Sequence, residues 1–352
     1  MVKRICQKTG LKLSILGLGC WAFGGNENDY WGEQSQKDVD CIVKEAFDLG
    51  ITYFDTAEAY NNCRSETSLG KAIKGIDREK IVIGSKILPS NLYADKIARH
   101  CEASLKRLDT DYLDLYMIHW PVNRHSLASF TKDQYVIDNP PSLEPAVAAL
   151  QQLRERGLIK HIGISNFGPI NLAEILTLEP AIGANQLIYN LFSRAIEHDV
   201  VPACEKNGIG IIAYMPLQQA MLTGRYNNIS ELPELRRRTR HFHRDSTPLS
   251  RHGGEGAEDQ INAALKDIKR ICAELDISVP ELALKWCTMN PAITSTIVGT
   301  RKVAQLRNSV QALDINLSPE VRDELDKLTR PVLETLGYGI DYFQGLGAQR
   351  GH

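Results

Sequence analysis

The stretch SQKDVDCIVKEAFDLGITYFD, residues 35–55, holds a helix pattern followed directly by a strand pattern. Five apolar residues recur at helical spacing and share one face: Val39, Ile42, Val43, Ala46 and Phe47. Gly50 favours the end of that helix, because glycine readily adopts the left-handed backbone of a C-terminal cap. The apolar run Thr52–Asp55 that follows is typical of a buried strand. This stretch alone therefore predicts one helix and one strand of an alternating α/β fold.

The same alternation extends through the chain. Seven further apolar runs, rich in β-branched residues, predict strands at Ser14–Leu18, Ile81–Ser85, Leu113–His119, Ile159–Ile164, Ala184–Ile188, Ile209–Tyr214 and Thr294–Val298. Amphipathic stretches predict helices at Ser35–Leu49, Ala94–Leu108, Pro145–Arg156, Leu172–Leu178, Asp199–Asn207, Gln260–Leu275, Pro280–Met289 and Lys302–Leu313. Eight strands that alternate with helices predict a parallel sheet closed into a (β/α)8 TIM barrel.

An open, doubly wound sheet is the alternative α/β fold. It would favour Gly-x-Gly-x-x-Gly after the first strand, whereas Gly17-Leu18-Gly19-Cys20-Trp21-Ala22 lacks the third glycine. We interpret Gly19, Cys20 and Trp21 instead as a strand end that leaves room for a ligand.

Three segments fall outside the repeat. Met1–Lys12 predicts a β-hairpin around Thr9-Gly10 that closes the bottom of the barrel. Leu222–Asp259 is a long polar loop, a kind of segment that is usually functional or disordered. Ser318 as N-cap and Pro319 in the first turn predict a terminal helix, with a glycine-rich tail, Gly337–His352, behind it. Because no domain linker interrupts the repeat, we expect residues 1–352 to form a single domain.

Composition and charge exclude several classes of protein. The 352 residues are 43% hydrophobic and 24% charged, with a net charge of −2, which fits an ordinary soluble globular protein and argues against nucleic-acid or membrane-surface binding. No stretch approaches the ~18 apolar residues of a membrane span, and Met1–Leu11 lacks the apolar core of a signal peptide. The eight cysteines form no Cys-x-x-Cys pair, so we expect reduced thiols in the cytoplasm. A homo-oligomer is compatible with the sequence.

Chemically active residues gather at three neighbouring strand ends. The second predicted strand ends at Asp55 with Tyr60 one loop further, the third is followed by Lys86, and the fourth ends at His119. Catalytic groups of barrel enzymes collect at this rim. Reduction of a carbonyl group by hydride produces an alkoxide that needs a proton, and a phenol can donate one.

The four residues support one another in that chemistry. A buried Lys86 ammonium is expected to lower the pKa of Tyr60, and Asp55 is expected to keep the ammonium charged and in place. His119 then holds the carbonyl oxygen or relays the proton. Taken singly, Asp55 could be a helix N-cap, Tyr60 an ordinary rim aromatic and His119 a core histidine. Their arrival on adjacent strand ends favours the catalytic interpretation.

Residues 52–60, Thr-Tyr-Phe-Asp-Thr-Ala-Glu-Ala-Tyr, resemble the Asp-Thr-Ala-x-x-Tyr signature of the aldo-keto reductase family. The resemblance continues from about Leu16 to Leu313. Further matching motifs are Gly84-Ser85-Lys86, Leu113–His119, Gly163-Ile164-Ser165-Asn166-Phe167 and Ala213-Tyr214-Met215-Pro216-Leu217. The resemblance implies that Asp55, Tyr60, Lys86 and His119 are the four catalytic residues, with Tyr60 as the proton donor.

The resemblance also implies a nicotinamide cofactor and the residues that bind it. Ser165, Asn166 and Gln186 match the positions that hold the nicotinamide carboxamide, and Tyr214 matches an aromatic that stacks on its ring. The expected remaining contacts near the ring and the pyrophosphate are Gly19, Cys20, Trp21, Asp55, Met215, Pro216, Leu217 and Arg225.

The eighth strand leads into the adenosine end of that site. Gly299, Thr300 and Arg301 form a glycine turn before a helix N-terminus, which is a favourable anion site. An Arg301 fork suits a 2′-phosphate, although a plain surface charge is the alternative. By resemblance, Gln305, Asn308 and Ser309 line the same end. Together these residues favour NADP(H) over NAD(H), while NAD(H) stays open.

The substrate pocket is expected to be aromatic. Trp21, Tyr30, Trp31 and Trp120 lie near the rim in sequence, beside Tyr60 and His119, although ordinary rim packing would also place them there. The Arg236–Arg240 cluster either clamps cofactor phosphates or belongs to a solvated loop. His241-x-His243 lacks the further ligands of a metal site, so we expect no metal.

These features predict an NADP(H)-dependent oxidoreductase that interconverts an aldehyde or ketone, such as a sugar, polyol or small aldehyde, and its alcohol. The absence of Tyr-x-x-x-Lys removes the short-chain dehydrogenase alternative. A second alternative comes from relatives of this family that act as cofactor-binding regulatory subunits of membrane channels. Those proteins usually carry Asn where this chain has His119, and we expect no long N-terminal gating extension here, which favours an enzyme.

Overall fold

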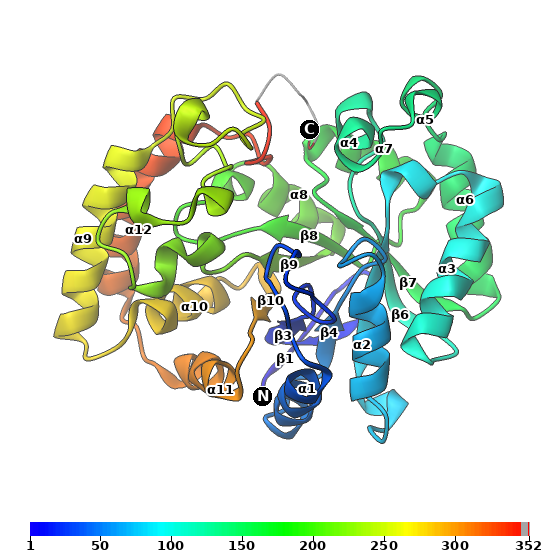
Figure 1. Cartoon of the computed structure of the whole chain (residues 1–352), viewed down its shortest axis with the longest axis horizontal. Helices are drawn as coiled ribbons and strands as arrows, with labels where there is room; N and C mark the ends of the chain where they lie inside the picture. Colours follow the sequence, from blue (N-terminus) through cyan, green and yellow to red (C-terminus); the bar gives the residue numbers. More distant parts are fainter. Residues whose placement is uncertain (346–350, 352) are drawn as a thin grey trace.

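The computed structural model describes residues 1–345 and residue 351. Eight parallel strands close into a barrel in the order β10-β3-β4-β5-β6-β7-β8-β9, with helices around the outside (Figure 1). The strands of the barrel are β3 (Leu16–Gly19), β4 (Tyr53–Asp55), β5 (Val82–Ile87), β6 (Leu113–Ile118), β7 (Ile159–Ser165), β8 (Ala184–Ile188), β9 (Gly210–Tyr214) and β10 (Ile293–Gly299). The predicted TIM barrel is confirmed.

The predicted N-terminal hairpin is also present. Strands β1 (Lys3–Ile5) and β2 (Lys12–Ser14) pair antiparallel, and Gly10 takes a left-handed φ of 74° in the turn between them. Ser14, predicted as the start of the first barrel strand, ends β2 instead. Its hydroxyl accepts hydrogen bonds from the backbone N–H groups of Thr52 and Tyr53, which ties the hairpin to the barrel.

Side chains of the hairpin fill the bottom of the barrel. Cys6, Leu11 and Leu13 form one buried cluster with interior residues that include Tyr53 and Leu115. Burial of this apolar surface stabilises the closed end, at roughly 25 cal/mol for each Å² removed from water. The opposite end, where the strands have their C-termini, is therefore the end open to a ligand.

An outer ring of helices follows the strands. Its members are α1 (Gln36–Asp48), α2 (Arg64–Ala72), α3 (Ala94–Leu108), α6 (Leu143–Glu155), α7 (Pro169–Leu178), α8 (Val200–Asn207), α10 (Val279–Met289) and α11 (Val303–Gln311). Helix α2 was not predicted, because its sequence RSETSLGKA offers only Leu69 and Ala72 as clear apolar residues. Two short helices, α4 (Arg124–Phe130) and α5 (Gln134–Asp138), rise from the segment after β6.

The terminal helix has the predicted start. In α12 (Pro319–Leu336), the Ser318 side chain accepts a hydrogen bond from the backbone N–H of Val321, and Pro319 occupies the first turn. This helix lies beside α9 (Glu258–Glu274), on the outside of the barrel (Figure 1). Among the described residues, no helix is long and apolar enough to cross a membrane.

The long segment after Leu222 packs against the chain terminus. Its only regular structure is short 3-10 turns at Ile229–Glu231, Glu234–Arg236 and Arg244–Ser246. The Arg240 guanidinium donates to the backbone oxygens of Leu336, Gly339 and Asp341, so the two segments hold each other over the barrel mouth. Of the predicted glycine-rich tail, residues 346–350 and 352 lie outside the described part of the chain.

Candidate active site

Three strand ends bring four polar side chains into contact. The Lys86 ammonium, fully buried at the end of β5, donates to Asp55 Oδ1 at 2.6 Å and to the backbone oxygen of Thr56 at 2.8 Å. The same ammonium lies 3.2 Å from the Tyr60 hydroxyl. The His119 and Tyr60 rings meet edge to face with their centroids 5.6 Å apart. The four residues predicted from the strand ends therefore form one cluster.

The second oxygen of Asp55 is held from the other side. Tyr53 Oη donates to Asp55 Oδ2 at 2.8 Å, and Gln186 Nε2 donates to the same oxygen at 2.7 Å. Gln186 was expected only at the nicotinamide amide, yet its amide nitrogen faces the cluster. Tyr53 was not singled out in the sequence, because a tyrosine within an apolar strand has the same pattern as a packing residue. The two side-chain oxygens of Asp55 thus accept hydrogen bonds from Lys86, Tyr53 and Gln186.

The pKa of Tyr60 departs from the expected direction. Burial raises the pKa of the Tyr60 phenol, and the Lys86 ammonium, the second largest effect, lowers it without overcoming burial. For Lys86 the balance is reversed. Burial alone would lower its pKa, but the interactions with Asp55 and Tyr60 outweigh burial, so the pKa of Lys86 is raised. The expectation of a lowered Tyr60 pKa was wrong, because it left out the cost of a buried phenolate. Tyr60 is therefore a protonated phenol beside a stable ammonium.

His119 is a neutral imidazole. Burial and the Lys86 charge hold its pKa well below the ordinary value. Its Nδ1 is buried without a hydrogen-bond partner among the described residues, and the Phe130 ring lies 6.0 Å away, centroid to centroid. A neutral ring carries one N–H, so His119 offers a donor beside Tyr60 without placing a second positive charge next to Lys86.

A second layer of amides lies along the rim. Asn166 has a left-handed φ of 65°, and its amide nitrogen donates to the backbone oxygen of His119 at 3.1 Å. Tyr214 Oη donates to Asn166 Oδ1 at 2.7 Å, and Ser165 Oγ donates to the backbone oxygen of Gln186 at 2.9 Å. The predicted carboxamide-binding residues thus form a connected, oriented group next to the catalytic cluster.

The backbone after β9 takes an unusual path. Met215, Gln218, Gln219 and Ala220 all have positive φ values, between 42° and 84°. Asn190 stabilises this turn, because its amide nitrogen donates to the backbone oxygen of Met215 at 3.0 Å and to Gln218 Oε1 at 2.8 Å. Strained backbone of this kind is typical of ligand-binding turns. The family motif pointed to Met215–Leu217, but no residue type marked the turn that follows.

A cavity of about 1410 Å³ connects these groups. It is lined by every residue predicted for the site except Lys86 and Tyr30. Lys86 lies beneath the wall, and Tyr30 stacks behind Trp21 with 5.2 Å between ring centroids. At the other end the cavity reaches Gly299, Thr300, Gln305, Asn308 and Ser309. A cavity of this volume, with polar groups both at the catalytic cluster and at the glycine turn after β10, fits a dinucleotide.

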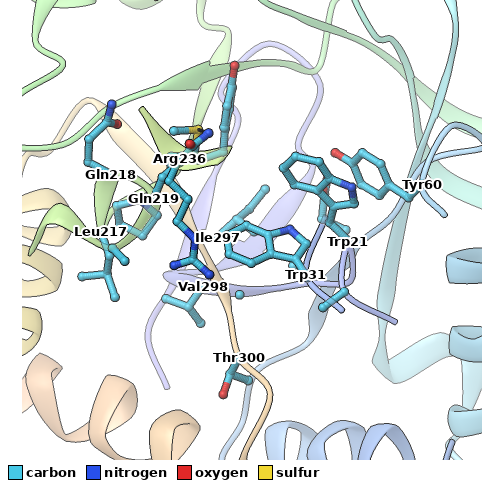
Figure 2. Close-up of a pocket in the computed structure, with 18 of the residues that line it drawn as sticks. Trp21, Trp31, Tyr60, Leu217, Gln218, Gln219, Arg236, Ile297, Val298 and Thr300 are labelled. Carbon is cyan, nitrogen blue, oxygen red and sulfur yellow. Dashed lines mark hydrogen bonds between the residues drawn. The ribbon is translucent and has the colours of Figure 1, made fainter. Parts of the chain in front are cut away.

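Aromatic rings form part of the cavity wall. Trp21 stacks on Tyr60 at 5.7 Å, and Trp31 meets Trp21 edge on at 5.6 Å, both between centroids. The Arg236 guanidinium lies 5.0 Å from the Trp31 ring centroid. Figure 2 shows Trp21 alongside Tyr60 and Arg236 beside Trp31, with Thr300 further along. Arg236 therefore reaches the cavity, whereas Arg240 of the same basic cluster is buried against the tail.

Arg301 has a role that the sequence did not indicate. Its guanidinium donates to the backbone oxygens of Trp31, at 2.6 Å, and of Glu33, and to Gln34 Oε1 at 2.9 Å. Arg301 thereby fixes the loop that carries Trp31. These bonds use three of the five N–H groups of the guanidinium.

A parallel barrel that joins a phenol, an ammonium, a carboxylate and an imidazole at one rim defines a class of barrel oxidoreductases. The model of the Aldo/keto reductase family matches residues 15–330, and the chain belongs to this family. The resemblance seen in the motifs is confirmed.

Similar proteins include enzymes and channel subunits. An Escherichia coli protein named NADH-specific methylglyoxal reductase is 31% identical, over 88% of this chain and 93% of that protein. A putative voltage-gated potassium channel subunit beta from Schizosaccharomyces pombe is 32% identical, over 92% of each chain. Among solved structures, an aldo-keto reductase from Klebsiella pneumoniae in complex with NADPH has a TM-score of 0.71, with 27% identity over 94% of this chain and 96% of the other.

Proposed function

We propose that the protein is an NADP(H)-dependent oxidoreductase that interconverts an aldehyde or ketone and its alcohol. The observation that carries the proposal is the Tyr60 phenol, held 3.2 Å from the buried Lys86 ammonium and beside neutral His119, in a cavity of about 1410 Å³ that also reaches the glycine turn after β10. The Klebsiella pneumoniae relative in complex with NADPH supports this cofactor. NAD(H) is the second choice, because the Escherichia coli relative is named NADH-specific.

The residues of the cavity fit such a cofactor. Ser165, Asn166 and Gln186 would hold the carboxamide, and Tyr214 would stack on the nicotinamide ring, which supplies or accepts a hydride when bound. Arg225 and Arg236, together with the strained turn after Met215, are the groups for the pyrophosphate. The open space at Gly299, where an added Cβ would meet no atom within 4 Å, leaves room at the adenosine end.

The catalytic cluster then positions the carbonyl oxygen and moves a proton. The Tyr60 hydroxyl and the His119 N–H donate to that oxygen. As the oxygen becomes an alkoxide it takes the Tyr60 proton, since an alkoxide is far more basic than a phenolate. Lys86 stabilises the phenolate left behind, and Asp55 holds Lys86 in place. In the oxidation direction, the phenolate takes the proton back from the alcohol.

A regulatory channel subunit is the competing function, given the Schizosaccharomyces pombe relative. The complete cluster of Asp55, Tyr60, Lys86 and His119 favours turnover. The eight free cysteines support a reducing compartment, and we place the protein in the cytoplasm.

Turnover separates the two functions. We expect oxidation of NADPH by methylglyoxal, glyceraldehyde and benzaldehydes, measured as loss of NADPH absorbance under steady-state conditions. The dissociation constant of NADPH, from the quenching of tryptophan fluorescence, is measured on the same preparation. Tight NADPH binding with no turnover of any carbonyl compound would reject the enzyme and leave the regulatory function.

The Arg301→Ala variant is expected to weaken NADPH binding about tenfold or more, because a charge-assisted hydrogen bond contributes roughly 1.5–3 kcal/mol. Binding of NADH should weaken less, because NADH lacks the 2′-phosphate and is affected only by the loosened loop of Trp31. The measurement is the ratio of the two dissociation constants. Arg301→Lys is the matched control that keeps the charge and loses the fork. Equal weakening of both cofactors would mean that Arg301 acts through the loop only and that the 2′-phosphate lies elsewhere.

A further inference from the structure

Five arginines line the cavity without an ion pair among the described residues: Arg225, Arg236, Arg238, Arg251 and Arg301. The proposed cofactor contacts use Arg225, Arg236 and Arg301, which leaves two. Arg238 and Arg251 come from the long segment after Leu222, and both line the same cavity as Tyr60 and His119. Within residues 1–345 and 351, neither one forms an ion pair, whereas the nearby Arg244 pairs with Glu255 at 2.5 Å. Cations that line a cavity without a counter-charge favour the binding of an anion there.

Arg238 is held in place by rings instead of by charge. Its guanidinium lies 4.6 Å from the Tyr30 ring centroid and 5.9 Å from that of Phe343. Its Nε is buried with no hydrogen-bond partner in the described chain. Ser250, which lines the same cavity, also buries its hydroxyl without a partner there. The cation is therefore fixed in position while its charge stays available, which is the arrangement of a pre-formed anion site.

The surroundings of Arg238 and Arg251 place them on the substrate side. Phe343 precedes Gln344, which donates to Ser129 Oγ at 2.7 Å and forms a backbone bridge with Arg251. Ser129 is next to Phe130, whose ring lies against His119. The contacts thus run from the two arginines to the catalytic histidine through the wall of helix α4.

The cofactor side has its own cations. Arg236 lies over Trp31, and Arg301 is bonded to the backbone oxygen of Trp31. Arg238 contacts the rings of Tyr30 and Phe343 instead. The cofactor phosphates therefore have separate partners.

We propose that Arg238, with Arg251 and Ser250, binds an anionic group of the carbonyl substrate, a carboxylate or a phosphate several bonds from the carbonyl carbon. The inference rests on the proposed carbonyl reduction and names its substrate class. Trp21 and Tyr30 separate Arg238 from Tyr60 through successive ring stacks, so the anion is not on the carbonyl carbon itself. Arginine suits both groups, because its planar fork matches two oxygens at once.

Matched aldehydes test the site. We expect kcat/KM for 4-carboxybenzaldehyde or 4-formylphenyl phosphate to exceed that for neutral 4-methoxybenzaldehyde by about tenfold or more, which would correspond to one charge-assisted contact. Whichever of the two anionic aldehydes has the higher kcat/KM identifies carboxylate or phosphate as the anionic group that the site binds. Arg238→Met should reduce the preference to about unity and leave the neutral aldehyde within about twofold. Arg251→Met should reduce it in part.

Controls keep the site separate from the cofactor and from the reaction. Arg244→Met, on the same segment but ion-paired outside the cavity, should retain the full preference. The dissociation constant of NADPH should not change in Arg238→Met; a large increase would assign Arg238 to the cofactor and overturn the proposal. A wild-type enzyme that shows no preference for the anionic aldehydes would overturn it as well.

Binding of the product alcohol gives a readout that does not need turnover. The dissociation constant of 4-(hydroxymethyl)benzoate, titrated into the NADP+ complex, is compared with that of 4-methylbenzyl alcohol. Tighter binding of the benzoate that depends on Arg238 supports the anion site even if every aldehyde fails to react, in which case only the proposed function is lost. Equal binding of both alcohols rejects the anion site.

Discussion

Tyr60→Phe is expected to lower kcat for carbonyl reduction by about 10²–10⁴, the usual contribution of a positioned general acid. The substitution removes the hydroxyl that lies beside Lys86 and changes little else, because Lys86 keeps its bonds to Asp55 and to the backbone of Thr56. The dissociation constant of NADPH should stay within about twofold. The measurements are steady-state kinetics and cofactor binding on the same preparation.

The control is a second buried tyrosine. Tyr116 lies in β6 with its hydroxyl buried and without a hydrogen-bond partner in the described structure. Tyr116→Phe makes the same chemical change away from the cavity, so its kcat should equal that of the wild type. Substantial turnover in Tyr60→Phe would refute the role of Tyr60 as the proton donor.

The catalytic cluster could be predicted because it depends on the ends of strands. Apolar runs mark where Asp55, Lys86 and His119 leave the barrel wall, and parallel strands deliver their C-terminal ends to one rim. The exact bounds matter less: β5 runs from Val82 to Ile87 instead of from Ile81 to Ser85, and Lys86 still faces Asp55. The direction in which the pKa of Tyr60 shifts could not be predicted in the same way, because the shift depends on how deeply the folded chain buries the phenol.

Residues that act through distant partners could not be found in the sequence. Arg301 binds the loop of Trp31, which lies more than two hundred residues earlier, and Tyr53 donates to Asp55 from the barrel interior. The long segment after Leu222 gave no periodic pattern, yet Arg240 and the backbone of the tail fix it over the cavity. Such positions are set by tertiary contacts, so residue types and spacing alone do not reveal them.

Lys86→Met is expected to lower both activity and stability. Loss of one electrostatic contact in an active site costs about 10²–10³ in kcat, and here the phenolate of Tyr60 loses its only cation among the described residues. The buried Asp55 also loses its ion-pair partner and keeps only the hydrogen bonds from Tyr53 and Gln186. Breaking a buried ion pair from one side costs roughly 3–5 kcal/mol. Stopped-assay kinetics and denaturant unfolding measure the two losses separately.

The double variant D55N/K86M separates those two effects. It removes both charges while an amide remains to pair with Tyr53 and Gln186, so most of the free energy of unfolding should return and the activity should not. The difference in free energy of unfolding between wild type and Lys86→Met should also stay constant between about pH 6 and 9. The pKa of Lys86 is raised in the folded state, so its ion pair stabilises the protein fully below the pKa of an unfolded lysine, and this stabilisation is lost only as the pH rises through the folded pKa. Both pKa values lie above this pH range. Activity restored together with stability would mean that Lys86 acts on the fold alone and that Tyr60 donates its proton without the help of the ammonium.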